Sequence, residues 1–409
     1  MLPDSIVEEG WSSYRDADFA REYRRLVGVM AEYPKLAYTQ REVRRAGEAL
    51  TGKLAWPEER EKILEAFAVA NSWRDSHLYP MRSVRISLAQ RMRWDGLKGF
   101  TVARPKRMTS IRKKLQKSTI NLEQINDIAG CRAVLDDIAS VNALIEICEN
   151  KFTQKIRQQY PYIAKPKADG YRSHHIVFDF QDAGEPDAFK GRRVELQLRT
   201  RLQHSWATAV EAVGLYRGED MKAGEGDTDW LRLFQLMSLE FAYAEKCDPL
   251  GVKNDQAVRL AEIRKLNQRL GAASVLEDLR NATHYLASYM QEQARYYIIR
   301  YENPTKEVTV SGYSSPFDAS AALARAEQKI EVGGDDAKVV LVEVGKVASL
   351  VEAYPNYFGD VALFIRNLRH VCDGKEAIEF SMAPQKLVAP KPHEKPDLGA
   401  IRRRYTKWS

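Results

Sequence analysis

Two acidic residues stand where the sequence predicts β-strands, and they are the first candidates for chemistry. Asp127 begins the apolar part of "INDIAGCRAV" (125–134), and Glu195 lies in "VELQLRT" (194–200), where apolar and polar residues alternate. Two carboxylates held on a sheet suit a hard cation such as Mg²⁺, which takes one or two carboxylates together with phosphate oxygens. Ordinary explanations also exist, because Asp127 could cap a helix or form a turn, and any half-exposed strand alternates in this way.

A stretch of cations supplies groups that could bind a phosphate chain. Residues 100–117, "FTVARPKRMTSIRKKLQK", hold seven basic residues and no acidic one. Arg104 and Lys106 point to the same face of a predicted strand, and Ser110 and Lys114 share one face of the helix predicted to follow. Four such groups converging on one point would bind a polyphosphate. A solvated basic helix surface is the commoner explanation of a charge run, so this stretch alone leaves both interpretations open.

The loop "KPKADGYRSHHIVF" combines a glycine, an aromatic ring and several cations before the next predicted strand. Gly170 allows close approach of the backbone, and Tyr171 offers a flat face on which a nucleobase can stack. Further along the chain, Gln197 and Arg199 share a strand face with Glu195. Acids, cations and an aromatic loop together predict phosphoryl transfer without a Walker loop.

The order of these residues resembles the synthetase domain of the RelA/SpoT superfamily, over about residues 70–215. Four spaced motifs carry the resemblance: R-x-K-x-x-x-S-x-x-x-K from Arg104, D-I-A-G-x-R from Asp127, G-Y-R-S-x-H from Gly170 and V-E-x-Q-x-R-T from Val194. That family transfers pyrophosphate from ATP to a ribose 3′-hydroxyl. The resemblance therefore implies an ATP pyrophosphokinase that uses Mg²⁺, with ATP as the pyrophosphate donor.

The resemblance also implies a role for each matching residue. Asp127 and Glu195 would be the catalytic residues and metal ligands, with Glu195 holding Mg²⁺ or accepting the proton of the attacking hydroxyl. The residues implied for ATP binding are Arg104, Lys106, Ser110, Lys114 and Arg132. Those implied for the acceptor are Tyr171, Ser173, His175, Gln197 and Arg199.

The chain departs from the family in two respects. The family places a second adenine-flanking arginine after the Asp motif, but no arginine lies between Arg132 and Arg157. Either Arg157 or Lys155 substitutes, or the adenine is held from one side only. The family's hydrolase site needs a His-Asp pair, and it is excluded because none of the seven histidines is followed by aspartate.

A shorter resemblance concerns "EAYPNYFGD" (352–360), where Tyr354 and Tyr357 frame a turn. Two aromatic residues packed into a small core would explain the pattern. The Y-x-x-Y turn also resembles the pseudo-zinc-finger antitoxin of the CapRel group. The proteins of that group are toxic small alarmone synthetases in which a toxin and its antitoxin are fused in one chain. That resemblance implies that the tyrosine pair blocks the adenine site and that a phage capsid protein releases the block.

Three hypotheses of function follow from these resemblances. The first is an autoinhibited anti-phage toxin that pyrophosphorylates the 3′-CCA end of tRNA and so blocks translation. The second is a (p)ppGpp alarmone synthetase, or GTP pyrophosphokinase, that uses GDP or GTP. The third, a catalytically inactive nucleotide or RNA sensor, is disfavoured because both acids and the phosphate-binding residues are present.

The order of the predicted helices and strands that carry these residues indicates an α+β fold. Apolar spacing predicts helices over 11–96 and 228–298. Between them, the β-prone runs "FTVARPK", "GCRAVL", "HHIVFDF" and "RRVELQLRT" alternate with helical stretches, as in a mixed-sheet nucleotidyl- or pyrophosphotransferase core flanked by helices. The runs "YYIIRYE", "KEVTVSGY" and "AKVVLVEV", with two helices, predict a small C-terminal α/β domain, which the second resemblance makes pseudo-zinc-finger-like.

The predicted divisions are an N-terminal helical region (1–97), a synthetase core (98–225), a helical connector (226–300), an antitoxin-like domain (301–380) and a basic tail (381–409).

Composition limits the partners and the compartment. The 409 residues carry a net charge of +7 with a pI near 9.0, which favours anionic partners such as nucleotides or RNA. We expect neither a signal peptide nor a membrane-spanning segment, since no run approaches eighteen apolar residues. The four scattered cysteines lack any C-x-x-C spacing, so they predict neither disulfides nor structural zinc and favour the cytoplasm.

Overall fold

The computed structural model describes most of the chain between residues 33 and 378. The described residues are 33–52, 59–181, 188–217, 219, 221, 224–247, 255–277, 296–302, 307–333, 337–343 and 361–378. Tyr354 and Tyr357 lie outside the described residues, as do the predicted tail and residues 1–32.

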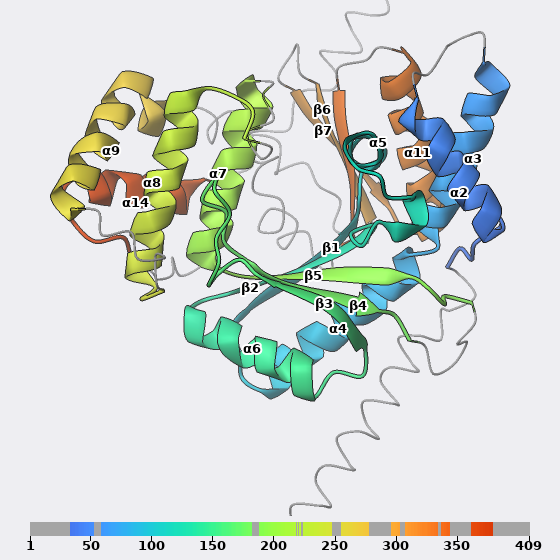
Figure 1. Cartoon of the computed structure of the whole chain (residues 1–409), viewed down its shortest axis with the longest axis horizontal. Coiled ribbons are helices and arrows are strands. Elements are labelled where there is room, and N and C mark those ends of the chain that lie inside the picture. The colour runs from blue at the N-terminus through green and yellow to red at the C-terminus, as the bar shows by residue number, and fades with distance from the viewer. Residues whose placement is uncertain are drawn as a thin grey trace, which may run out of the picture.

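A mixed β-sheet runs through the described part of the chain, in the order β3-β4-β5-β2-β1-β8-β6-β7 (Figure 1). The strands are β1 (Gly99–Pro105), β2 (Ala129–Leu135), β3 (Lys155–Pro161), β4 (His174–Asp179), β5 (Arg193–Thr200), β6 (Tyr296–Glu302), β7 (Glu307–Tyr313) and β8 (Ala337–Glu343). Strands β2 and β5 are parallel and the other neighbouring strands are antiparallel. The predicted α+β class with a mixed sheet is confirmed.

All the β-prone runs became strands, but β3 was not predicted. It has the sequence "KIRQQYP" and an irregular burial pattern, with a register shift between Ile156 and Gln158 opposite β4. An edge strand pairs with one neighbour only and exposes most of its side chains, so it needs no apolar alternation.

The central strands separate an apolar face from a polar one. On the apolar face, alternate residues of β2 and β5 pack with α4 (Leu78–Trp94) and α6 (Ile138–Asn150), which lie below the sheet in Figure 1. The apolar residues contributed by the two strands are Ala129, Cys131, Ala133, Leu135, Val194, Leu196 and Leu198. The intervening side chains of β5, including Glu195 and Gln197, therefore point to the other face.

Helices from the N-terminal region support α5 (Met108–Lys117), the predicted phosphate-binding helix. They are α2 (Gln40–Thr51) and α3 (Arg60–Asp75), with the short 3₁₀ helix η2 (Leu122–Gln124) beside them. Ile111 and Leu115 of α5 are buried in one core with residues such as Leu50 and Phe67. The apolar face of α5 is thus buried, and its remaining faces are left for its polar residues.

A second group of helices lies on the left in Figure 1, across the molecule from α2 and α3. It consists of α7 (Arg201–Arg217), α8 (Thr228–Ala244), α9 (Gln256–Leu270) and α14 (Ala362–Cys372). Phe364 of α14 is fully buried, with its ring centroid 5.6 Å from that of Phe234 on α8. Among the described helices, none is both long and apolar enough to cross a membrane.

Residues of the range 301–380, predicted as one small domain, lie in two places. Strands β6–β8 and α11 (Pro316–Gly333) continue the main sheet, with β8 beside β1 through the pair Ala103 and Glu343. Helix α14 instead packs against α7 and α9. The final third of the chain therefore contacts both sides of the synthetase core.

Candidate active site

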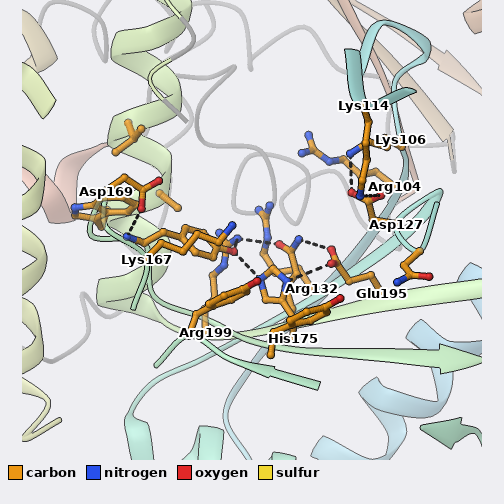
Figure 2. Close-up of a pocket in the computed structure, with 18 residues that line it drawn as sticks. Arg104, Lys106, Lys114, Asp127, Arg132, Lys167, Asp169, His175, Glu195 and Arg199 are labelled. Atoms are coloured by element: carbon orange, nitrogen blue, oxygen red, sulfur yellow. Dashed lines mark hydrogen bonds and ion pairs between the residues drawn. The ribbon is translucent and has the colours of Figure 1, made fainter. Parts of the chain in front are cut away.

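A cavity of about 450 Å³ lies on the polar face of the central strands, between α5 and α7 (Figure 2). The structure brings together most of the residues predicted for catalysis, ATP and acceptor. Those that line the cavity are Arg104, Lys106, Lys114, Asp127, Arg132, Tyr171, His175, Glu195, Gln197 and Arg199. Their individual roles remain predictions, but their convergence from β1, α5, β2, β4 and β5 is a feature of the fold.

The two acids lie on the same side of the sheet. Asp127 lies two residues before the start of β2, and Glu195 is paired with Gly130 in the parallel β2–β5 ladder. Both side chains line the cavity, and the charge of Asp127 acts to raise the pKa of Glu195, although other contacts outweigh it. Both carboxylates therefore face one cavity, and their role as ligands of one metal–nucleotide complex stays a prediction.

Asp127 forms ion pairs with the two lysines predicted to bind phosphate. Lys106 Nζ lies 2.6 Å from Oδ2, and Lys114 Nζ lies 2.9 Å from Oδ1. Burial acts to raise the pKa of Asp127, but the two lysines outweigh it and lower the pKa to about 2. Asp127 is therefore ionised throughout the physiological range, and it holds both ammonium groups at the cavity wall.

Glu195 has a hydrogen-bond donor on each carboxylate oxygen. His175 Nδ1 lies 3.2 Å from Oε1, and Gln197 Nε2 donates to Oε2 at 2.8 Å. Burial acts to raise the pKa of Glu195, but the hydrogen bond from His175 and the other contacts lower it below the ordinary value. Glu195 is thus an ionised acceptor in a fixed orientation.

A hydrogen-bond network links Glu195 to the aromatic side of the cavity. Tyr171 Oη lies 2.8 Å from His175 Nε2, and Arg199 Nη2 donates to Tyr171 Oη and to Gln197 Oε1. The His175 ring therefore bridges the Glu195 carboxylate, through Nδ1, and the Tyr171 hydroxyl, through Nε2. The Tyr171 ring is therefore held in place by its own hydroxyl group.

The backbone of the Tyr171 loop is fixed by α8. Gly170 has φ +92°, and a Cβ there would lie 3.1 Å from Ser238 Cβ and 3.3 Å from Gln235 Cα. Ser238 Oγ donates to the carbonyl oxygen of Gly170, and Asp169 Oδ1 accepts from the backbone N–H of Tyr171. Only glycine combines this dihedral with so close an approach to a helix.

Two predicted residues do not line the cavity. Ser110 is half-buried on α5. Ser173 is fully buried, donates to the carbonyl oxygen of Leu198 and accepts from Arg199 Nε, so it supports the guanidinium from behind. The two substitutes considered for the adenine-flanking arginine are also outside the cavity lining, and one of them, Arg157, pairs with Asp179 at 3.4 Å.

Several cavity residues were not anticipated from the sequence. They are Asn126, Tyr160, Tyr162, Lys167, Asp169, Trp206, Ala207 and Val210. Aromatic residues interleaved with lysines in "YPYIAKPK" could have indicated part of this set. The residues on α7 carried no comparable signal, because their position depends on how that helix packs beside the sheet.

Comparison with known proteins agrees with this site. Residues 103–221 match the model of the family described as "Region found in RelA / SpoT proteins". This part of the chain is therefore similar to a region found in RelA and SpoT proteins, and every residue that lines the cavity falls within it.

Named relatives also match part of the chain. GTP diphosphokinase CRSH2, chloroplastic, from Oryza sativa subsp. japonica is 36% identical over 128 residues, which are 29% of this chain and 22% of that protein. GTP pyrophosphokinase from Escherichia coli (strain K12) is 29% identical over 151 residues, or 36% of this chain and 19% of that protein. The chain thus spans about a fifth of the length of these curated relatives.

Solved structures of similar proteins are shorter than this chain. A GTP pyrophosphokinase family protein from Streptococcus pneumoniae is 22% identical, covers 49% of this chain and 95% of its own, and gives a TM-score of 0.37. Small alarmone synthetase 1 from Bacillus subtilis, bound to its product pppGpp, is 21% identical, covers 45% and 94%, and gives a TM-score of 0.36.

Proposed function

We propose that this protein is an ATP-dependent pyrophosphotransferase that acts on a ribose 3′-hydroxyl. The observation that carries the proposal is the arrangement of one cavity: Asp127 with Lys106 and Lys114 lies at one end, Arg199 lies toward the other, and Glu195 lies between them (Figure 2). The Tyr171 hydroxyl is hydrogen-bonded to Arg199. A phosphate chain and an acceptor bound at the two ends would meet at Glu195.

In the proposed reaction the 3′-oxygen attacks the β-phosphorus of ATP. A new O–P bond forms, the bond from that phosphorus to the oxygen bridging the α-phosphate breaks, and AMP leaves. Glu195 accepts the proton of the hydroxyl, which its ionised state and fixed orientation allow. Lys106 and Lys114 exchange Asp127 for phosphate oxygens when ATP binds, and this exchange releases the Asp127 carboxylate.

The donor set fits Mg²⁺. Of the three carboxylates that line the cavity, Asp127 and Glu195 lie on the side of Lys106 and Lys114, whereas Asp169 lies beside Lys167 (Figure 2). The described residues contain no group of three or more His, Cys, Asp or Glu side chains that could enclose a metal. Mg²⁺ is commonly held by one or two carboxylates, with phosphate oxygens and waters as its other ligands. When bound, it would neutralise charge on the phosphate chain.

We propose the 3′-CCA end of tRNA as the acceptor. Tyr160, Tyr162 and Tyr171 all line the cavity, and Lys167 Nζ lies 4.8 Å and 5.1 Å from the ring centroids of Tyr162 and Tyr171. Several aromatic rings beside a cation support the binding of a single-stranded nucleic acid, since successive bases stack on such rings. GDP or GTP is the second candidate, because the curated relatives are named for guanine nucleotides.

We also propose that Tyr354 and Tyr357 hold the enzyme inactive, so that the C-terminal part of the chain acts like a pseudo-zinc-finger antitoxin. In this proposal the protein is cytoplasmic, and a phage capsid protein releases the inhibition. The described residues on either side of the two tyrosines, Glu343 and Val361, support this proposal. Glu343 pairs with Ala103, which precedes Arg104, while Val361 is buried in the core that includes α7. An aromatic ring can occupy a slot shaped for adenine.

The test of transfer uses purified Tyr357→Ala protein, in which the proposed block is removed, with Mg²⁺, ATP labelled at the γ-phosphate, and tRNA, GDP or GTP as acceptor. Label in tRNA alone is the expected result, and label in guanine nucleotides alone would assign the second acceptor. Label in neither, with folded protein and bound ATP, contradicts the proposed reaction.

Autoinhibition predicts that Tyr357→Ala makes expression toxic, whereas the double variant Tyr357→Ala/Glu195→Gln does not. Normal growth with Tyr357→Ala at wild-type protein levels contradicts autoinhibition.

A further inference from the structure

Helix α5 lacks an N-terminal cap of its own. The residue before it, Arg107, makes no side-chain capping hydrogen bond, and the first turn holds no acidic residue. The first N–H groups of a helix have no partner within the helix, and the positive end of its dipole favours an anion. In a helix as basic as α5, the need for an external anion is greater still.

That anion comes from the C-terminal third of the chain. Glu327 of α11 is buried, and its Oε1 accepts a hydrogen bond of 2.7 Å from the backbone N–H of Met108, the first residue of α5. The two residues are 219 positions apart in sequence. Figure 1 shows α11 and α5 on the same side of the sheet.

Glu327 is itself held by a buried ion pair. Its Oε2 lies 2.5 Å from Nη1 of Arg74 on α3, and the two side chains are 2% and 0% exposed. Arg74 Nη2 also donates to Asn71 Oδ1 at 2.7 Å, and Asp75 Oδ1 lies 3.9 Å from Arg74 Nε. Both oxygens of the Glu327 carboxylate are therefore engaged, which fixes it at the end of α5.

The position of α5 determines where two cavity cations lie. Lys114 is six residues beyond Met108 on this helix, and Lys106 is two residues before Met108. Both Nζ atoms reach Asp127 in the cavity. A shift of the first turn would therefore move both ammonium groups.

We propose that Glu327 is a positioning residue for the ATP phosphates, acting through the N-terminus of α5 and anchored by Arg74. The proposal rests on the proposed function, in which Lys106 and Lys114 bind ATP. It makes α11 a working part of the synthetase rather than a separate attachment. Glu327 touches neither substrate.

The test measures ATP affinity and backbone protection in Glu327→Gln, and the reference protein and every variant carry Tyr357→Ala so that the proposed block does not mask ATP binding. Loss of the anion should raise the Kd and KM for ATP about tenfold, since a buried charge at a helix N-terminus has an effect of that order. The KM for the acceptor should stay near the wild-type value. Hydrogen exchange of residues 108–111 should accelerate with or without nucleotide.

A matched control separates positioning from general destabilisation. Glu240 forms an equally buried ion pair with Arg259, with side chains 5% and 3% exposed and a distance of 2.7 Å, in the α8–α9 group outside the cavity lining. Glu240→Gln should lower the melting temperature without changing the Kd for ATP or exchange in α5. An equal rise in the Kd for ATP in both variants would overturn the proposal.

A second variant covers the case in which Glu327→Gln folds poorly. Arg74→Gln/Glu327→Gln removes both charges of the ion pair, so no buried charge is left unpaired. This double variant should be more stable than Glu327→Gln, while its Kd for ATP stays raised. A wild-type Kd in this double variant would overturn the proposal. If the Tyr357→Ala protein neither binds nor transfers from ATP, the proposed function fails instead, while unchanged exchange of 108–111 in Glu327→Gln still counts against Glu327.

Discussion

Asp127, Lys106 and Lys114 form an ion-paired group, and in the proposed complex the phosphates of ATP replace the carboxylate at the two lysines. The two ammonium groups lie on the two oxygens of one carboxylate, so their geometry suits a second pair of phosphate oxygens. Without Asp127, two lysines would repel one another at the cavity wall. The same contacts that prepare the phosphate site therefore also stabilise the fold.

This group predicts a specific dependence of stability on pH. The folded pKa of Asp127, about 2, lies below the ordinary 3.8, so the ionised form stabilises the folded state. The contribution, about 2 kcal/mol, is complete above roughly pH 5 and is lost as the pH falls through the folded pKa. Between about pH 5 and pH 3, the unfolding free energy of wild type should fall about 1 kcal/mol more than that of Asp127→Asn. Urea denaturation measures both; identical slopes would show that the lysines do not lower this pKa.

Glu195 has the contacts expected of a base rather than of a phosphate ligand. Glu195→Gln keeps the size of the side chain but removes the proton acceptor, so transfer should fall by about 10²- to 10⁴-fold while the Kd for ATP stays nearly unchanged. Glu149→Gln is a control, because Glu149 is an exposed acid on α6 that contacts Gln159. Turnover near wild type in Glu195→Gln would reject the assignment of the base.

At the scale of elements, the loop that carries Tyr171 depends on α8. Gly170 and Gly191 both have positive φ, +92° and +77°, but a Cβ at Gly191 meets nothing within 4 Å. Alanine at either position strains the backbone by about 1–2 kcal/mol. Only at Gly170 does the added carbon also press against α8.

Gly170→Ala should therefore raise the KM for the acceptor by about ten- to a hundredfold, because Tyr171 moves relative to Glu195. Gly191→Ala should lose similar stability and keep the wild-type KM. Steady-state kinetics with a fixed, saturating ATP concentration distinguishes the two variants. An equal KM in both would mean that the loop does not position the acceptor.

At the scale of the whole molecule, deleting the C-terminal third would also remove contacts on which the rest of the fold depends. Deleting residues from about 300 onward would remove α14, whose Phe364, Ile365, Leu368 and Val371 are buried with α7 and α8, and would also remove Glu327 from α5. Loss of activity in such a truncation would report unfolding, so the point variant Tyr357→Ala is the sharper test of inhibition.

Phe364→Ala measures how much the core depends on this helix. Removing a fully buried ring that packs against Phe234 and Phe241 should lower the unfolding free energy by about 3–5 kcal/mol. Calorimetry should show a lower melting temperature, and Val258→Ala, an exposed aliphatic position on α9, should leave it unchanged. A small effect of Phe364→Ala would indicate that α14 is only loosely associated with the rest of the group.

The sequence by itself determined the chemistry-bearing residues and most of the strands. Alternation along β5 was enough to put Glu195, Gln197 and Arg199 on one face, because side chains alternate in any strand. Spaced motifs identified the synthetase domain that the family comparison supports. Local periodicity and residue type are properties of short stretches, so they can be read without a fold.

Only the tertiary structure decided which distant residues complete the site. Strand β3 brings Tyr160 to the cavity although its polar sequence predicts no strand, and α7 contributes Trp206 from the opposite wall. The bond from Met108 to Glu327 joins residues 219 positions apart, which no local pattern encodes. Such contacts depend on how elements pack against one another, and packing is set by the shape of whole surfaces rather than by the sequence of any one of them.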